Sequence, residues 1–206
     1  YICSYAFSGC KKLTKVTFQE NSELISIGDY AFSTSTIGPI SIPVHVNKIG
    51  EFAFYGCKNL KKVEFSENSE LKSINKKAFS WSSLESITLP KHFNSIEESA
   101  FSGCKALKEV HFLEGSELNS IEKEAFSWSS IEAISIPSSV KSIGESCFYQ
   151  CKNLKKVTFP DNSELQVIEK NAFFNSSIET FSIPIHVVKI CEGTFGRCKN
   201  LKKVEV

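Results

Sequence analysis

The sequence predicts an α/β solenoid, in which a parallel β-sheet runs along one face and short helices run along the other. Two observations support this fold: a fixed period of 47 residues, and a switch from helix-like to strand-like spacing of apolar residues within each period. A period of this length without insertion or deletion is typical of repeat arrays. The residues that keep it are Ile2, Ile49, Ile96, Ile143 and Ile190; Phe7, Phe54, Phe101, Phe148 and Phe195; and Cys10, Cys57, Cys104, Cys151 and Cys198.

The 47-residue unit consists of two similar coils. A second isoleucine register (Ile27, Ile74, Ile121 and Ile168) divides it into 25 and 22 residues. We therefore expect about nine coils in a single array over residues 1–206. Methionine is absent and neither end carries a polar capping repeat, which solenoids usually need for solubility. We expect the chain to be a fragment of a longer protein lacking its caps.

The long coils begin with a helical pattern. Ile49, Ala53, Cys57 and Leu60 are spaced by four, four and three residues, which predicts one face of a short helix. Phe54 is placed beside that face.

A strand pattern follows over residues 60–65. Val63 and Phe65 alternate with the polar Lys62 and Glu64, so we expect the apolar pair to point inward. A polar turn over residues 66–70 leads into the next coil. Stacked coils should rise by one strand spacing, about 4.8 Å.

The short coils repeat this order of elements. Ala78 and Phe79 are equivalent to Ala53 and Phe54, and residues 84–89 form the next expected strand. A proline then ends each strand, because it cannot donate a hydrogen bond to a ladder. The prolines in this position are Pro43, Pro90, Pro137 and Pro184.

The repeated pattern resembles the BspA-type leucine-rich repeats, which occur in surface proteins of oral bacteria and of parasitic protists. The motif is Leu-x-x-Val/Ile-x-Phe/Ile, a polar or proline turn, then Ile-x-x-x-Ala-Phe-x-x-Cys, and it covers essentially the whole chain. The resemblance implies a right-handed, horseshoe-like leucine-rich-repeat solenoid at the cell surface or outside the cell. It also implies adhesion to host matrix proteins, cell–cell aggregation or general protein binding. It brings no defined binding residues with it.

The cysteines and histidines are interpreted as structural. Cysteines of one column lie two coils apart, about 10 Å, whereas a disulfide needs Cα atoms within about 7 Å. We therefore expect small buried thiols and no metal site. His45, His92 and His186 share another column with Ser139 in the fourth place, and we interpret them as turn residues. Unpaired thiols favour a reducing compartment, so a cytoplasmic location stays open.

Charge is distributed along two edges, although the net charge is only +1. Of the 24 basic residues, 14 precede the strands of the long coils: Lys11, Lys12, Lys15, Lys58, Lys61, Lys62, Lys105, Lys108, Lys152, Lys155, Lys156, Lys199, Lys202 and Lys203. Acidic residues follow the same strands: Glu20, Glu23, Glu67, Glu70, Glu114, Glu117, Asp161 and Glu164. These edges either keep the sheet soluble or form a linear footprint for an acidic protein or an anionic polymer.

The candidate partner-binding residues lie on this basic edge and on the outward face of the strands, together with two tryptophans. The tryptophans are equivalent, and each either anchors a partner or covers the neighbouring coil. The candidates are Lys15, Lys61, Lys62, Glu64, Lys108, Glu109, His111, Lys155, Lys156, Lys202, Lys203, Trp81 and Trp128.

The predicted function is a non-enzymatic protein-binding or adhesion module. No phosphate loop, nucleophile elbow or metal motif occurs, so we expect no catalytic residues, no cofactor and no small-molecule substrate. The expected partner is a host matrix or other cell-surface protein, with a sulphated glycan as a further candidate. The single arginine, Arg197, argues against nucleic acid, and no apolar run is long enough to span a bilayer. The alternative is an intracellular scaffold subunit of a larger assembly.

Overall fold

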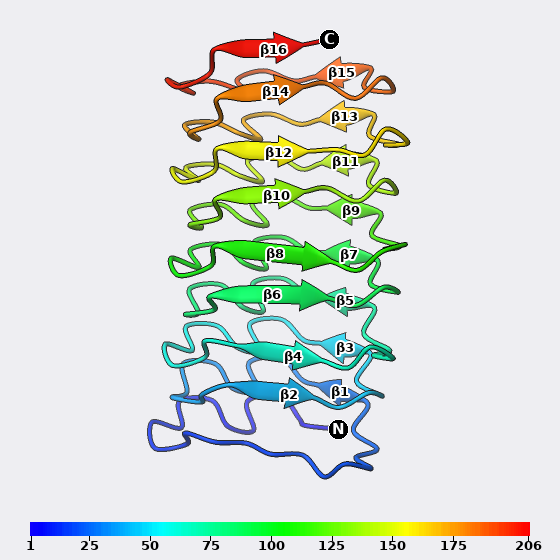
Figure 1. Ribbon diagram of the computed structural model, residues 1–206. Coiled ribbons are helices and arrows are strands. Elements are labelled where there is room, and N and C mark those ends of the chain that lie inside the picture. Colours follow the sequence, from blue (N-terminus) through cyan, green and yellow to red (C-terminus); the bar gives the residue numbers. More distant parts are fainter.

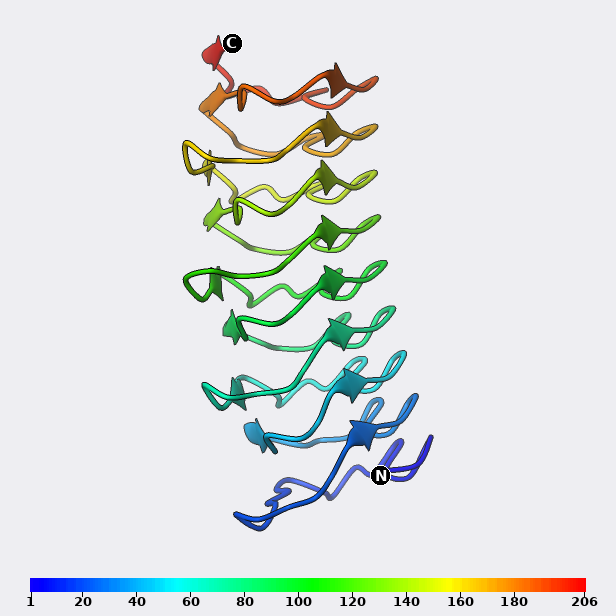
Figure 2. The same ribbon diagram turned by 90° about the vertical axis from the view of Figure 1, so that its right-hand side faces the viewer.

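The computed structural model describes residues 1–206 as a single β-solenoid of about eight turns. The coils stack in sequence order, and the two termini lie at opposite ends of a stack that curves only slightly (Figures 1 and 2). The horseshoe shape expected from the sequence is therefore weakly developed. The number of coils is also corrected, since about eight turns are present instead of nine.

One face carries a continuous parallel sheet of eight strands. Each strand has two residues, an outer one followed by an inward isoleucine, and each pairs with the equivalent strand of the next coil. The strands are β1 (Ser26–Ile27), β3 (Lys48–Ile49), β5 (Ser73–Ile74), β7 (Ser95–Ile96), β9 (Ser120–Ile121), β11 (Ser142–Ile143), β13 (Val167–Ile168) and β15 (Lys189–Ile190). Ile49 thus lies in a strand, not on a helix.

The opposite face, called the strand face below, is made of four parallel pairs. Each pair joins a short coil to the long coil after it: β2 (Ile40–Ile42) with β4 (Val63–Phe65), β6 (Ser86–Leu89) with β8 (Glu109–Phe112), β10 (Ala133–Ser135) with β12 (Lys156–Thr158), and β14 (Thr180–Ser182) with β16 (Lys203–Glu205). Successive pairs touch with little hydrogen bonding, as at the single bridge from Lys62 to Ser86. The strands expected from alternation at residues 60–65 and 84–89 are confirmed.

The predicted helices are wrong, because the structure contains no helix. Each coil instead has two successive tight turns with left-handed residues four apart, such as Phe52 (φ 53°) and Gly56 (φ 64°). The backbone N–H groups of these turns donate alternately within the turn and to the next coil. Tyr55 N donates to Phe52 O of the same turn, whereas Phe54 N donates to Ala78 O of the next coil. A left-handed residue at every fourth position prevents an α-helix. The two turns nevertheless place side chains that are four residues apart on the same face, as a helix would.

Phenylalanine fills the centre of the stack. Nine rings form a ladder along the array, and neighbouring rings stack at centroid distances of 5.1–5.6 Å with planes within 10° of parallel. Phe54, predicted beside the apolar face, is fully buried in this ladder. The ladder is Phe7, Phe32, Phe54, Phe79, Phe101, Phe126, Phe148, Phe173 and Phe195.

The three extra residues of a long coil lie on both sides of its strand. Two residues separate Cys57 from buried Leu60, but one separates Ser82 from buried Leu84. Beyond the strand, the long turn over residues 66–70 replaces the tighter turn that begins at Pro90. Figure 2 shows the long turns projecting beyond the short ones on alternate coils. Protruding turns therefore recur every two coils.

Candidate functional site: the strand face and the charged edge

Side chains of the strand face are held by contacts within and between coils. Lys62 directly precedes β4, and its Nζ lies 2.6 Å from Oε1 of Glu64 in that strand. Ser41 Oγ of β2 donates to Glu64 Oε2 at 2.8 Å. These two donors, Lys62 foremost, hold the pKa of the Glu64 carboxyl below its ordinary value. The predicted candidates Lys62 and Glu64 are therefore exposed and in mutual contact.

The same arrangement recurs at the C-terminal end. Lys203 Nζ of β16 lies 2.6 Å from Glu205 Oε1, and Ser182 Oγ donates to Glu205 Oε2 at 2.7 Å. In β8 the pair is Glu109 and His111, 3.1 Å apart. A carboxylate thus lies beside a lysine or histidine side chain at three of the four long-coil strands.

An open hollow of about 610 Å³ lies over the middle of the strand face. It spans β8, β10 and β12, and the predicted candidates Glu109, His111 and Lys156 line it together with Thr158. The hollow is open, and its lining mixes polar side chains with apolar ones such as Phe112 and Ile136. An open hollow of this kind fits a side chain or loop of a macromolecule better than an enclosed small molecule. Lys15 lies apart from this group, exposed on the first coil and outside any strand.

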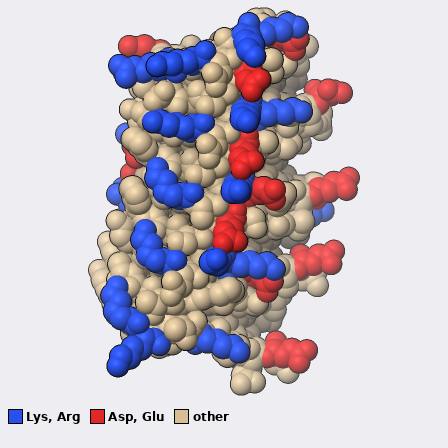
Figure 3. Space-filling model, turned by 60° about the vertical axis from the view of Figure 1, so that its left-hand side comes forward, with Lys and Arg blue, Asp and Glu red and all other residues tan.

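The predicted basic edge is partly neutralised, because five of its 14 lysines lie within 4.0 Å of a glutamate carboxylate. Lys61 Nζ lies 3.1 Å from Glu85, Lys108 lies 3.7 Å from Glu132, and Lys202 lies 4.0 Å from Glu179. Backbone hydrogen bonds place Lys155 between Glu132 and Glu179 in the same column. Figure 3 shows this column of alternating blue and red along the stack. We call it the alternating column: Lys61, Glu85, Lys108, Glu132, Lys155, Glu179 and Lys202.

Sequence reasoning missed the three glutamates of the alternating column. Glu85, Glu132 and Glu179 are themselves 47 residues apart. Each directly follows the buried apolar residue that precedes a short-coil strand. The lysines occupy the same place in the long coils. Aligning short with long coils on Leu60 and Leu84 would have revealed the alternation.

The second part of the basic edge is not neutralised. Five lysines at 47-residue intervals have no carboxylate within ion-pair distance, and we call them the lysine row. Figure 3 shows blue patches separated by tan beside the alternating column. The lysine row consists of Lys11, Lys58, Lys105, Lys152 and Lys199.

The two tryptophans lie beside the lysine row. Trp81 is 44% exposed and Trp128 is 41% exposed. Lys58 Nζ lies 5.9 Å from the Trp81 ring centre, and Lys105 Nζ lies 4.9 Å from that of Trp128. The Trp81 ring also covers Gly103 of the following coil. The ring therefore both packs on its neighbour and remains accessible.

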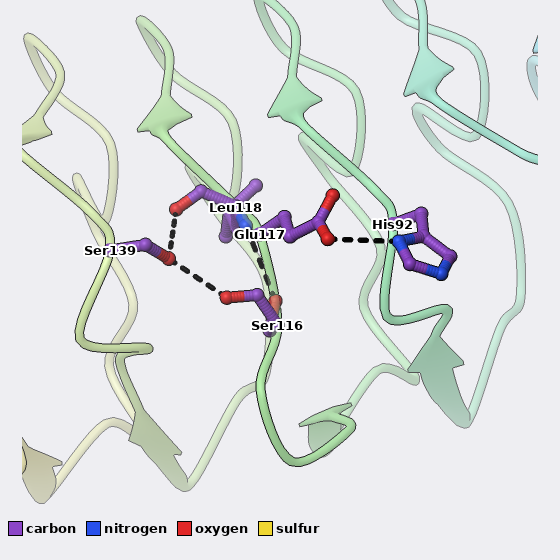
Figure 4. A network of polar contacts seen from close by, with 5 residues as sticks. All are labelled: His92, Ser116, Glu117, Leu118 and Ser139. Atoms are coloured by element: carbon purple, nitrogen blue, oxygen red, sulfur yellow. Dashed lines mark hydrogen bonds and ion pairs between the residues drawn. The ribbon is translucent and has the colours of Figure 1, made fainter.

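The acidic turns are tied to the short coils on either side (Figure 4). His92 Nδ1 lies 2.9 Å from Glu117 Oε1, while Ser139 Oγ donates to Ser116 O at 2.9 Å and to Leu118 O at 2.8 Å. His45 makes the equivalent contact with Glu70. The histidine column thus serves as turn contacts, as predicted, and its serine member fixes the turn from the other side.

The cysteine column is structural. Cys104 Sγ donates to Phe79 O at 3.0 Å and lies 3.5 Å from Ser82 Oγ, and Cys57, Cys151 and Cys198 repeat these contacts. All eight cysteines are free. Burial raises the pKa of Cys57, Cys104 and Cys151 to about 11. Such thiols are poor nucleophiles.

No group of three or more histidine, cysteine, aspartate or glutamate side chains is placed to hold a metal ion. No helix long and apolar enough to cross a membrane is present.

Comparison with solved structures finds the same fold in bacterial proteins. The pneumococcal vaccine antigen PcpA is 26% identical with a TM-score of 0.66, over 82% of this chain and 51% of its own. A leucine-rich repeat protein from Bacteroides ovatus is 23% identical with a TM-score of 0.65, over 98% of this chain and 69% of its own. The chain thus spans about half the length of the pneumococcal protein. No curated protein matches it.

The sequence profile described as "BspA type Leucine rich repeat region" matches six copies over residues 1–80 and 72–202. These ranges cover nearly all of the chain and leave out only residues 203–206. The chain therefore belongs to the BspA-type leucine-rich-repeat family.

Proposed function

We propose that this protein is a surface-displayed, non-enzymatic binding module that holds a protein partner against its strand face. The observation that carries the proposal is the outward row of paired charged and polar side chains on β4, β8, β12 and β16. Glu64, Glu109, His111 and Lys156 are exposed, whereas Val63, Val110 and Val157 beside them are buried in the core. The site is therefore broad, open and fixed in position before a partner arrives.

The rigidity of the face favours binding. Its backbone is held from both sides by the stack, and Lys62, Glu64 and Ser41 restrain one another's side chains. Ordering such a surface on binding costs less than ordering free loops. Because the charges alternate in sign over short distances, a protein with a complementary mixed surface fits better than a uniformly charged one.

The comparisons support the surface location. Members of the family are typically protein-binding or surface-associated, and one structural relative is named as a vaccine antigen. An adhesive role at the cell surface is the corresponding proposal for this chain.

An affinity capture with the intact array tests the proposal. Proteins retained by the wild type should be lost by the variant Glu64→Lys/Glu109→Lys/Lys156→Glu, which reverses the strand-face charges. They should be kept by Lys76→Glu/Glu98→Lys, which exchanges an ion pair away from that face. Partners that bind both variants equally would contradict a strand-face site.

The intracellular scaffold is the second candidate, and the free thiols favour it. Cys3 is exposed and unpaired, a state that a reducing compartment preserves. Its test is the location of the full-length protein in intact cells. Labelling by a membrane-impermeant reagent supports surface display, whereas labelling only after lysis supports the scaffold.

A further inference from the structure

The lysine row and the two tryptophans form one continuous strip along the edge where the turns lead into the strands. Lys58 Nζ lies over the Trp81 ring and donates to Trp81 O at 2.8 Å, and Lys105 Nζ lies over the Trp128 ring. Lys152 occupies the next equivalent position. Successive coils thus present lysine, tryptophan, lysine, tryptophan and lysine.

The positive charge of this strip is available to a ligand. Lys61, Lys108 and Lys202 of the neighbouring column each have a glutamate partner, but no carboxylate lies within ion-pair distance of the lysine row. Each ammonium has three protons, and the bond from Lys58 to Trp81 O uses only one of them. An incoming anion therefore displaces no existing ion pair.

The tryptophans are held in place before a ligand binds. Both have left-handed backbones (φ 59° at Trp81 and 61° at Trp128), which bulky residues seldom adopt. Trp81 reaches over Gly103, where a methyl group would come within 2.7 Å of the ring. The exposed part of each ring is thus presented at a fixed angle, one per two coils.

Spacing selects the ligand. Equivalent groups of the strip recur every two coils, about 10 Å. Each strand of a nucleic-acid duplex has one phosphate per about 3.4 Å of helix axis, which is far denser than one lysine per two coils. Heavily sulphated glycans likewise carry several charges per disaccharide. An extended β-linked disaccharide with a single carboxylate covers about the two-coil distance.

We propose that this strip binds a linear, non-sulphated polysaccharide in which uronic acid alternates with a neutral sugar. Each lysine pairs with one carboxylate, and each indole contacts the C–H surface of the neutral sugar between two carboxylates. The site is separate from the strand face and goes beyond the protein-binding function proposed above.

Hyaluronan fragments of defined length provide the probe, with binding measured by titration calorimetry. A decasaccharide has five carboxylates, one for each lysine of the row, and should bind at least about ten-fold more tightly than a tetrasaccharide. Its affinity should fall as salt rises, because the contacts are exposed ion pairs. Absence of binding by the decasaccharide at low salt would overturn the proposal.

Two variants separate the contributions of charge and ring. Lys58→Gln/Lys105→Gln/Lys152→Gln should weaken decasaccharide binding about ten-fold and flatten its salt dependence. Trp81→Asn/Trp128→Asn should weaken it by about the same factor without changing the salt dependence. Asparagine suits this site, since Asn175 holds the same place with φ 56°.

The matched control lies in the adjacent column. Lys61→Gln/Lys108→Gln/Lys202→Gln removes the same number of charges and should change the affinity less than about two-fold. An equal loss in this control would show that net charge alone drives binding. Equally tight binding of a polyglutamate peptide with five carboxylates would also contradict the proposal, because such a peptide lacks both the spacing and the sugar rings.

Discussion

The long and short coils share one core but differ on almost every outward side. Both contribute a phenylalanine to the ladder and an isoleucine to the eight-stranded sheet. The long coils add the cysteine column, most of the lysines and the protruding acidic turns, whereas the short coils provide serine, proline and the glutamates of the alternating column. The shared core therefore sets the rise per coil. Because long and short coils alternate, equivalent surface features recur at twice that rise.

The largest effect should come from the feature that the two coil types share. Phe101→Ala in a long coil and Phe126→Ala in a short coil each remove a fully buried ring from the ladder. Each should lower the free energy of unfolding by about 3–5 kcal/mol, because the stack closes poorly over the cavity. Denaturant unfolding measures both. A clear difference between the two would show that the coils do not share one core.

The cysteine column should make stability depend on pH through the long coils. Burial raises the pKa of Cys57, Cys104 and Cys151 from about 9 to about 11. The stabilising contribution is complete below pH 9 and is lost as the pH rises to 11, because the unfolded thiols ionise first. Each thiol should account for up to roughly 2 kcal/mol.

Denaturant unfolding at several pH values checks this dependence. The control variant Cys57→Ser/Cys104→Ser/Cys151→Ser places in the long coils the residue that the short coils already have. Its curve should be flatter between pH 9 and 11. A variant that loses stability as steeply as the wild type in this window would contradict the assignment to the cysteine column.

Substitutions at two equivalent glycines distinguish the cost of displacing the Trp81 ring from the cost of backbone strain. Gly103 and Gly56 hold equivalent left-handed positions (φ 71° and 64°), but only Gly103 faces the Trp81 ring, whereas Gly56 faces Thr34 at 3.5 Å. Gly56→Ala should cost about 1 kcal/mol from its φ alone. Gly103→Ala should cost about 1–3 kcal/mol and should shift the tryptophan emission, because the ring must move. Equal costs and an unchanged emission would argue against the ring contact.

The smallest effect should come from the alternating column. Lys108 and Glu132 are more than half exposed and lie 3.7 Å apart. Exposed pairs of this kind contribute about 0.2–1 kcal/mol, so Lys108→Ala should change the unfolding midpoint very little. Thermal unfolding measures it. A loss comparable with that of Phe101→Ala would mean that the column supports the fold.

The sequence predicted the array because identical residues at fixed intervals must meet in a stack. Val63, Leu60 and Cys57 were placed inward correctly on this basis, and the parallel strands followed from alternation. It failed for the helices because four-residue spacing is common to a helical turn and to two tight turns. Only the backbone distinguishes them, through left-handed residues such as Phe52 and Lys77, which sequence propensity disfavours.

The candidate site was less predictable than the fold. Lys62, Glu64, Glu109 and His111 were correctly placed outward. The sequence did not predict the ion pairs of Lys61 and Lys108, because their glutamate partners lie in the short coils. The expected charged edges were confined to the long coils. Which lysine lies beside a carboxylate depends on how the residues of a long coil align with those of the next short coil. That alignment depends on the one extra residue that a long coil has before its strand.

The central claim is that the long coils carry the protein-binding residues of the strand face and that the short coils space these residues. Its most direct test is the dissociation constant of a captured partner for two strand-face variants. Lys62→Ser/His111→Ser/Lys156→Ser changes only long-coil residues, and the matched Ser41→Ala/Ser86→Ala/Ser135→Ala changes only short-coil residues. We predict a loss of at least about ten-fold for the first variant and less than about two-fold for the second. Equal losses, or the reverse order, would contradict the account.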